Sequence, residues 1–155
     1  MRALIVSVAL TATTICPELA VAQVVTVASE GAHAAIARAV ALLPRRPARI
    51  VVLDRNSAMA RRPTLSKGVE AFVPTGDTTI YLIEEGDCLQ HAVSQGAIFD
   101  YALALTIWHE MAHVEGADER EAQRREEALW QVFIVEGRVD RDRGMKYLAL
   151  LRRRH

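Results

Sequence analysis

This sequence has few cysteines and no excess of charge of either sign. Its 155 residues contain two cysteines, and the 19 Lys and Arg residues equal the 19 Asp and Glu residues in number. A net charge of zero gives no indication of a basic face, which is the usual mark of a nucleic-acid-binding protein. We therefore expect no nucleic-acid partner. The sequence also has no internal repeat and no low-complexity stretch, and its length suits a single globular domain.

The first 22 residues have the pattern of a secretory signal peptide. Arg2 supplies the positive charge, residues 3–15 form a small apolar stretch, and residues 20–22 fit the rule for the cleavage site. The apolar run is short for a membrane span, and an uncleaved anchor or a first buried strand are the alternatives. We therefore expect a signal peptide at 1–22. The mature domain, residues 23–155, would be exported to the periplasm or secreted from the cell.

Removal of the signal peptide would leave a single cysteine. Cys16 lies within the signal, so only Cys88 remains and no internal disulfide can form. The stability of the mature domain must then come from a packed core, to which a bound metal could add. We expect the Cys88 thiol to be buried, because free cysteine packs as a small hydrophobic residue.

Hydrophobic periodicity predicts one α+β domain with a small mixed or antiparallel sheet and two central helices. Runs of β-branched residues indicate strands, and Pro74 to Asp77 would turn the last two strands into a hairpin. The segments 54–67 and 85–95 have the composition of loops. The predicted strands cover residues 48–53, 68–73 and 78–84, and the predicted helices cover residues 29–43, 97–114, 118–136 and 140–153.

The predicted helix at 97–114 is apolar on nearly every side and contains neither proline nor glycine. A helix of this kind belongs in the middle of a domain. A membrane span is the competing interpretation, but Asp100, His109, Glu110 and His113 would then all lie inside the bilayer. We therefore expect no stable membrane span after removal of the signal peptide.

Two histidines of this helix, His109 and His113, are four residues apart. This spacing puts both imidazoles on one face, one turn apart, where they can share a metal ion. Glu110 follows the first histidine, and its carboxylate can take the proton of a water that attacks a carbonyl carbon. A catalytic site of this kind needs a third protein ligand and an open fourth position.

Several acidic residues after the helix could supply the third ligand. Gly116 allows the chain to turn back, which would bring Glu119, six residues past His113, within reach of the metal. Glu126 lies two turns further along the next helix, on roughly the same face, and would take its place if the turn were wider. The sequence favours Glu119 and leaves Glu126 open.

The motif His109-Glu110-Met111-Ala112-His113 resembles that of the zincin metallopeptidases. Its continuation through Gly116 to Glu119 is similar to the metzincin pattern His-x-x-Gly-x-x-His, with Glu119 in place of the last His. Residues 119–122, Glu-Arg-Glu-Ala, also resemble the Glu-x-x-Ala signature of gluzincins, whose glutamate is the third zinc ligand. We assign no single family. The final His and a Met-turn are absent, and Gln123 stands where gluzincins often carry Asp or Asn.

This resemblance implies a zincin-like fold and a zinc metallopeptidase. His109, His113 and Glu119 would hold Zn²⁺, and Glu110 would be the general base acting on a peptide or protein substrate. Zincins place an edge strand of the sheet above the metal, antiparallel to the bound peptide, and residues 78–84 would be that strand.

Two further roles near the metal stay open. Zincins often add a Tyr, His or Arg that stabilises the oxyanion, and Tyr101, His91 and Tyr147 are candidates. The alternative function is a non-catalytic zinc-binding structural or interaction domain with a zincin-like fold, and a structural protein without metal is a further alternative. Cys88 could close the fourth position of the metal site, or hold an enzyme in a latent state.

Overall fold

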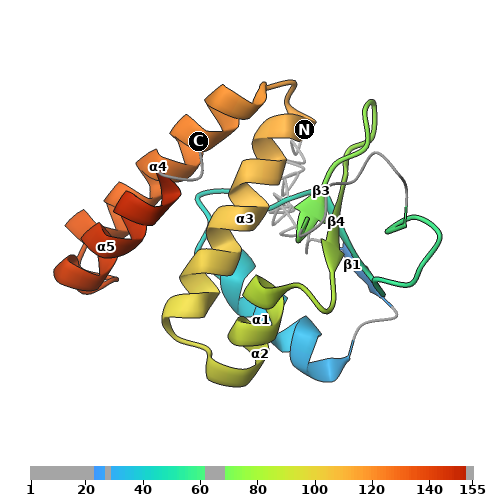
Figure 1. Ribbon diagram of the computed structural model, residues 1–155, viewed down its shortest axis with the longest axis horizontal. Helices are drawn as coiled ribbons and strands as arrows, with labels where there is room; N and C mark the ends of the chain where they lie inside the picture. The colour runs from blue at the N-terminus through green and yellow to red at the C-terminus, as the bar shows by residue number, and fades with distance from the viewer. Residues whose placement is uncertain (1–22, 27–28, 62–68, 153–155) are drawn as a thin grey trace, which may run out of the picture.

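The computed structural model describes residues 23–26, 29–61 and 69–152 of the chain (Figure 1). The predicted signal peptide, residues 1–22, and residues 62–67 of the first predicted loop lie outside the described part. Helices and strands are both present, so the predicted mixed α+β class is confirmed. In chain order the elements are β1 (Gln23–Thr26), α1 (Glu30–Ala41), β2 (Arg49–Leu53), β3 (Ala71–Phe72), β4 (Thr79–Ile83), α2 (Asp87–Gln95), α3 (Ile98–Val114), α4 (Glu119–Val135) and α5 (Arg141–Leu151).

The strands form one small mixed sheet in the order β1-β2-β4-β3. β1, β2 and β4 run parallel, whereas β3 is antiparallel to β4 and pairs with it through Ala71–Leu82 and Phe72–Tyr81. The turn between β3 and β4 is closed by the N–H of Asp77, which donates to the carbonyl oxygen of Pro74 at 2.9 Å. The predicted hairpin and the mixed character of the sheet are therefore confirmed.

The prediction that residues 78–84 form the edge strand is wrong. β4 lies inside the sheet, between β2 and β3. β2 already occupies one side of β4, so the first arm of the hairpin pairs on the other side and itself becomes the edge. The strand at this edge of the sheet is β3.

The predicted loop at 85–95 is also wrong, because residues 87–95 form helix α2. Its N-cap, Gly86, has no side chain that could satisfy the first turn. The carboxylate of Glu70 does so instead, accepting a hydrogen bond from the N–H of Cys88 at 3.3 Å. Leu89 and Ala92 then bury the inner face of the helix. Strand β1 was likewise not expected, and it adds a parallel edge beside β2.

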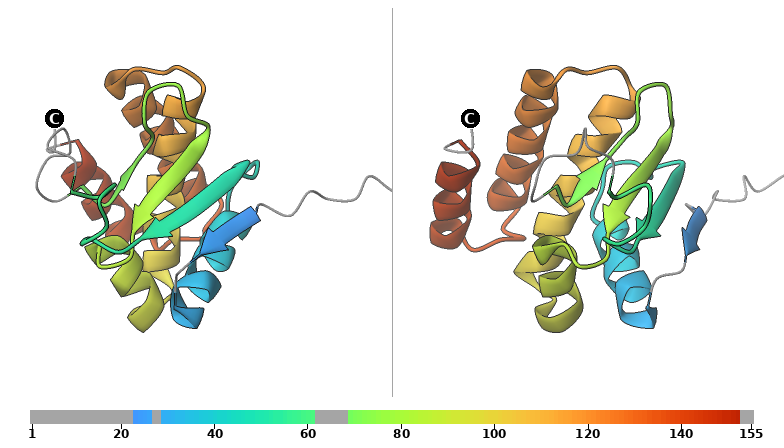
Figure 2. Two further views of the ribbon diagram at one scale, coloured as in Figure 1. Left: turned by 90° about the vertical axis from the view of Figure 1, so that its right-hand side faces the viewer. Right: turned by 45° about the vertical axis from the view of Figure 1, so that its right-hand side comes forward.

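Two apolar clusters hold the helices in place, and α3 belongs to both. Leu103, Ile107 and Met111 of α3 pack with α1, α2, β2 and β4, while Leu105 packs with α4 and α5. Figure 2 shows the sheet, α3, α4 and α5 following one another across the molecule. This arrangement explains why α3 is apolar on nearly every side and confirms its predicted central place. Across the described residues, no helix combines the length and hydropathy needed to cross a membrane.

Candidate metal centre

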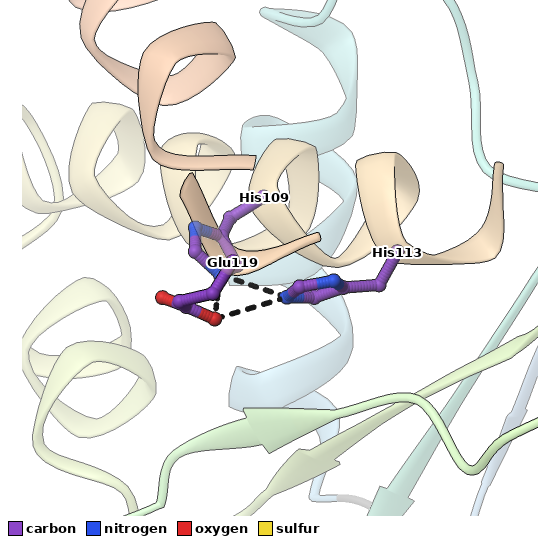
Figure 3. Close-up of side chains that lie close together, drawn as sticks. All are labelled: His109, His113 and Glu119. Carbon is purple, nitrogen blue, oxygen red and sulfur yellow. Dashed lines mark hydrogen bonds and ion pairs between the residues drawn. The ribbon is translucent and has the colours of Figure 1, made fainter. Parts of the chain in front are cut away.

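The side chains of His109, His113 and Glu119 come together beside α3 (Figure 3). The Nε2 atoms of the two histidines are 3.1 Å apart. Oε2 of Glu119 lies 3.5 Å from Nε2 of His109 and 3.3 Å from Nε2 of His113. The structure thus brings the three predicted ligands together from two helices, and metal binding itself stays a prediction.

A tight helix ending at Gly116 brings Glu119 back to the histidines. Gly116 has a φ of 84°, the left-handed conformation that glycine adopts without strain. The N–H of Ala117 donates to the carbonyl of Ala112 at 3.0 Å, and the N–H of Gly116 donates to that of His113 at 2.9 Å. This pair of bonds defines a Schellman motif, so the predicted turn at Gly116 is confirmed.

Helix α4 starts directly after this turn. The side chain of Asp118 accepts a hydrogen bond from the N–H of Glu121 at 2.8 Å and so acts as the N-cap. Glu119 is therefore the first residue of α4, held between a capped helix end and a Schellman turn. Both features fix the path of the backbone at Glu119.

The other nitrogen of each imidazole has a partner that can only accept a hydrogen bond. Nδ1 of His109 lies 3.1 Å from Oε2 of Glu126, and Nδ1 of His113 lies 3.0 Å from the carbonyl oxygen of Ala117. A carboxylate and a carbonyl both require Nδ1 to carry the proton. In the neutral rings, Nε2 then presents its lone pair toward the other histidine and toward Glu119.

This donor set fits a divalent metal ion. Two nitrogen lone pairs and a carboxylate that face one another repel unless a cation or a proton lies between them. Two ligands of a tetrahedral zinc ion, each at about 2.0–2.1 Å, are roughly 3.3 Å apart. The separations of 3.1–3.5 Å among the three atoms match that value. The spacing of the three atoms and the protonation of the two Nδ1 atoms are therefore both consistent with a zinc ion bound at this place.

Glu126, the second candidate for the third ligand, occupies a different place. Its carboxylate contacts Nδ1 of His109 and not the Nε2 atom that faces Glu119. Partners of this kind fix the orientation of a ligating histidine and raise its basicity. Burial lowers the pKa of His109, but the hydrogen bond and the charge of Glu126 outweigh it, and the pKa is raised. Glu126 is thus an orienting residue, a role that the sequence did not suggest.

Glu119 is held in an ionised state. Its side chain is 64% exposed, and Nε2 of Gln123 donates to Oε1 at 2.7 Å, which leaves Oε2 facing the histidines. Partial burial raises the pKa of Glu119, but the bond from Gln123 and the positive charge that the two imidazoles carry when protonated outweigh it, and the pKa is lowered. Gln123 therefore orients the carboxylate from the next turn of α4.

Glu110 is buried beside the histidines, with 7% of its surface exposed. Burial raises the pKa of its carboxyl group, while the two histidines act in the opposite direction and only partly offset this effect. A carboxylate that is reluctant to stay charged is a stronger base than one in water. Glu110 is thus buried beside the proposed metal ligands, and its role as a general base stays a prediction.

A cleft of ≈ 710 Å³ gives solvent and ligands access to this group. α3 lines one side with His109, Glu110, His113 and Val114, and the hairpin lines the other side from Ala71 to Thr78. The histidines are partly exposed in it, so a fourth ligand position would face the cleft. A volume of this size falls within the range of ligand pockets.

Four other candidates from the sequence lie elsewhere. Tyr101 and Tyr147 pack in the cluster between α3, α4 and α5, and His91 stacks on Phe99 at 4.8 Å. Cys88 packs against the first cluster, where its sulfur accepts from the hydroxyl of Thr106 at 3.7 Å. None of the four lines the cleft. The structure thus places these open candidates outside the cleft: Cys88, Tyr101 and Tyr147 pack against the two apolar clusters, and His91 lies on the exposed face of α2.

No protein-family model, curated protein or solved structure matches this chain.

Proposed function

We propose that this protein is an exported zinc-dependent metallopeptidase with His109, His113 and Glu119 as metal ligands. One observation carries the proposal. Nε2 of His109, Nε2 of His113 and Oε2 of Glu119 lie 3.1–3.5 Å from one another beside an open cleft, while acceptors contact both Nδ1 atoms. A zincin-like fold is part of the same proposal, supported by the histidine motif on a central helix.

The chemistry follows from what surrounds that point. When bound, a zinc ion would lower the pKa of a water molecule and polarise the carbonyl of a substrate. Glu110, which lines the cleft next to His109, would take the proton of the attacking water and pass it to the departing amine. The product would be a free carboxylate and a free amine.

The cleft favours an extended peptide as the substrate. β3 is the strand at the sheet edge next to α3 and also lines the cleft. The outer backbone groups of an edge strand can pair with an added chain. A peptide laid along β3 would pass in front of His109 and Glu110, with its side chains alternating between the cleft and solvent.

The first test is zinc content together with hydrolysis. We expect about one zinc per chain in the purified protein, and loss of the metal in His113→Ala. Glu110→Gln should keep the metal and lose hydrolysis of an unfolded protein substrate by a factor of about 10² or more. Glu127→Gln is the matched control, since Glu127 pairs with Arg152 away from the cleft. Full activity in Glu110→Gln would contradict the mechanism.

The same measurements distinguish the peptidase from the alternative, a non-catalytic zinc-binding domain. It would bind zinc through the same residues and hydrolyse nothing. A structural zinc site is normally closed by a fourth protein ligand. Among the described residues, the group that could hold a metal consists of His109, His113 and Glu119 alone, which favours the catalytic function. Zinc binding without hydrolysis of any unfolded protein would favour the structural domain instead.

Export is proposed from residues 1–22 of the sequence. Cell fractionation and the N-terminal sequence of the mature protein test it. A mature N-terminus at Gln23 in the exported fraction is the expected result, whereas an intact Met1 in the cytoplasm would contradict it.

A further inference from the structure

A second, smaller cavity adjoins the cleft. It measures ≈ 210 Å³ and shares two lining residues with the cleft, Thr78 of the hairpin and Val114 of α3. Val114, which lines the cavity, directly follows the proposed metal ligand His113 on α3. We call this cavity the side pocket. Thr78 and Val114 thus lie at the boundary between the cleft and the side pocket.

The floor of the side pocket is apolar. Ile80 of β4 and Met111 of α3 are both buried and line it from below, together with Pro47 from the segment between α1 and β2. Ala48 and Thr78 are exposed and lie at its mouth. An apolar floor with an open mouth suits one aliphatic side chain, because burial of that chain removes apolar surface from water.

Two arginines, Arg45 and Arg46, also line the side pocket. Arg45 forms an ion pair with Glu115, and its guanidinium lies 5.2 Å above the ring of Trp108. Arg46 is exposed and, within the described part of the chain, forms no ion pair. The described lining of the pocket therefore carries two positive charges, Arg45 and Arg46, and one negative charge, Glu115. A second cation that entered the pocket would be repelled by Arg46.

We propose that the side pocket is a specificity site that takes an aliphatic side chain, such as that of leucine, and rejects lysine and arginine. The inference rests on the proposed function, since it names the class of peptide that the cleft would cleave. A peptide bound in the cleft would lie beside Thr78 and Val114, which line both the cleft and the side pocket. The apolar floor supplies the attraction, and Arg46 supplies the discrimination against basic residues.

The test is a binding measurement that needs neither zinc nor hydrolysis. Methyl NMR signals of Ile80, Met111 and Val114 are followed while N-acetyl-leucinamide or N-acetyl-lysinamide is added to the full chain. The leucine derivative should shift all three signals. The lysine derivative should need about tenfold higher concentration for the same shift. Equal responses to the two compounds, or no shift at these methyl groups, would overturn the proposal.

Three variants locate the binding. Ala48→Phe fills the mouth and should weaken the leucine response about tenfold or more, whereas Ala128→Phe, at an exposed site on α4, should leave it unchanged. Arg46→Glu should bring the lysine response closer to that of leucine. An unchanged leucine response in Ala48→Phe would refute the pocket as the site. Zinc content tests the proposed function separately, so binding of leucine to a protein that takes up no zinc would keep the pocket and remove the peptidase.

Discussion

Oε2 of Glu126 lies 3.1 Å from Nδ1 of His109, on the opposite side of the imidazole ring from Glu119. The two glutamates are seven residues apart on α4, so they share one face of that helix. Their surroundings differ, since the side chain of Glu126 is 14% exposed and that of Glu119 is 64% exposed. A single helix thus completes the proposed metal group with one carboxylate and orients it with another.

Removal of the orienting carboxylate should weaken zinc binding without abolishing it. In Glu126→Ala we expect the affinity for zinc to fall about 10- to 100-fold, because His109 loses the partner that fixes its ring and its protonated nitrogen. Competition with a chelator of known affinity measures the change. Glu127→Ala, the neighbouring residue on the same helix, should bind zinc as the unchanged protein does. A loss of all zinc in Glu126→Ala would instead make Glu126 a ligand.

The turn at Gly116 should matter for zinc beyond its effect on stability. Gly116 and Gly137 both have positive φ angles, of 84° and 69°, and a Cβ at either position would meet no atom within 4 Å. Alanine at either site should therefore cost a similar free energy of unfolding, about 1 kcal/mol, from backbone strain alone. Chemical denaturation measures this cost.

Zinc affinity should separate the two variants. Gly116→Ala disturbs the carbonyl of Ala117, which orients His113, and the start of α4 that carries Glu119. Gly137 lies in the turn between α4 and α5, far along α4 from the site. We expect a lower affinity for zinc in Gly116→Ala and an unchanged affinity in Gly137→Ala. Equal zinc affinities in both would show that the turn does not position the ligands.

Sequence reasoning succeeded where the signals are local. The first helix was predicted to begin at residue 29, and the structure has Ser29 as its N-cap, with the hydroxyl accepting from the N–H of Ala32 at 3.3 Å. The spacing of His109 and His113 and the glycine turn before Glu119 are also local, so the whole proposed metal group could be located. α3 was placed at the centre because its apolar residues surround the helix, which requires neighbours on all sides.

Sequence reasoning failed where the deciding contact is distant in the chain. The first turn of α2 is completed by Glu70, which precedes Cys88 by 18 residues, so no local cap marked this helix. Which arm of the hairpin forms the edge depends on β2, which pairs with β4. The role of Glu126 depends on which nitrogen of His109 it meets, and helix spacing alone does not determine this. Each error has its origin in tertiary structure.

The pair Arg38–Asp100 should show strong energetic coupling. Nε and Nη2 of Arg38 donate to the two carboxylate oxygens of Asp100 at 2.9 and 3.0 Å, and Nη2 also donates to the carbonyl of Ala92 at 2.8 Å. Asp100 is nearly buried, whereas the arginine side chain is 46% exposed. Arg38→Met should thus leave a poorly hydrated carboxylate and cost about 1–3 kcal/mol in the free energy of unfolding.

The double variant tests this coupling. Arg38→Met combined with Asp100→Asn removes the charge that the single variant leaves without its partner. We expect its cost to be clearly below the sum of the two single costs in urea denaturation. Costs that add to within about 0.5 kcal/mol would show that the bidentate pair has no energetic role.

Ionisation of Asp77 should make the stability of the fold depend on pH in the acidic range. Its pKa is lowered mainly by the hydrogen bond from the N–H of Thr79 at 2.9 Å, with burial acting against it and the Tyr81 hydroxyl, 3.1 Å away, adding to it. A lowered pKa in the folded state means that the ionised carboxylate stabilises the fold above its ordinary pKa of about 3.9. This contribution is lost as the pH falls through the lowered value.

Asp77→Asn isolates the charge, because the amide oxygen can still accept from Thr79. The variant should melt at a lower temperature than the unchanged protein near neutral pH. The difference in Tm should shrink as the pH is lowered below about 4, where the native carboxylate also becomes protonated. Thermal unfolding at a series of pH values measures it. A difference that stays constant from neutral to acid pH would mean that the charge of Asp77 contributes nothing and that only its shape matters.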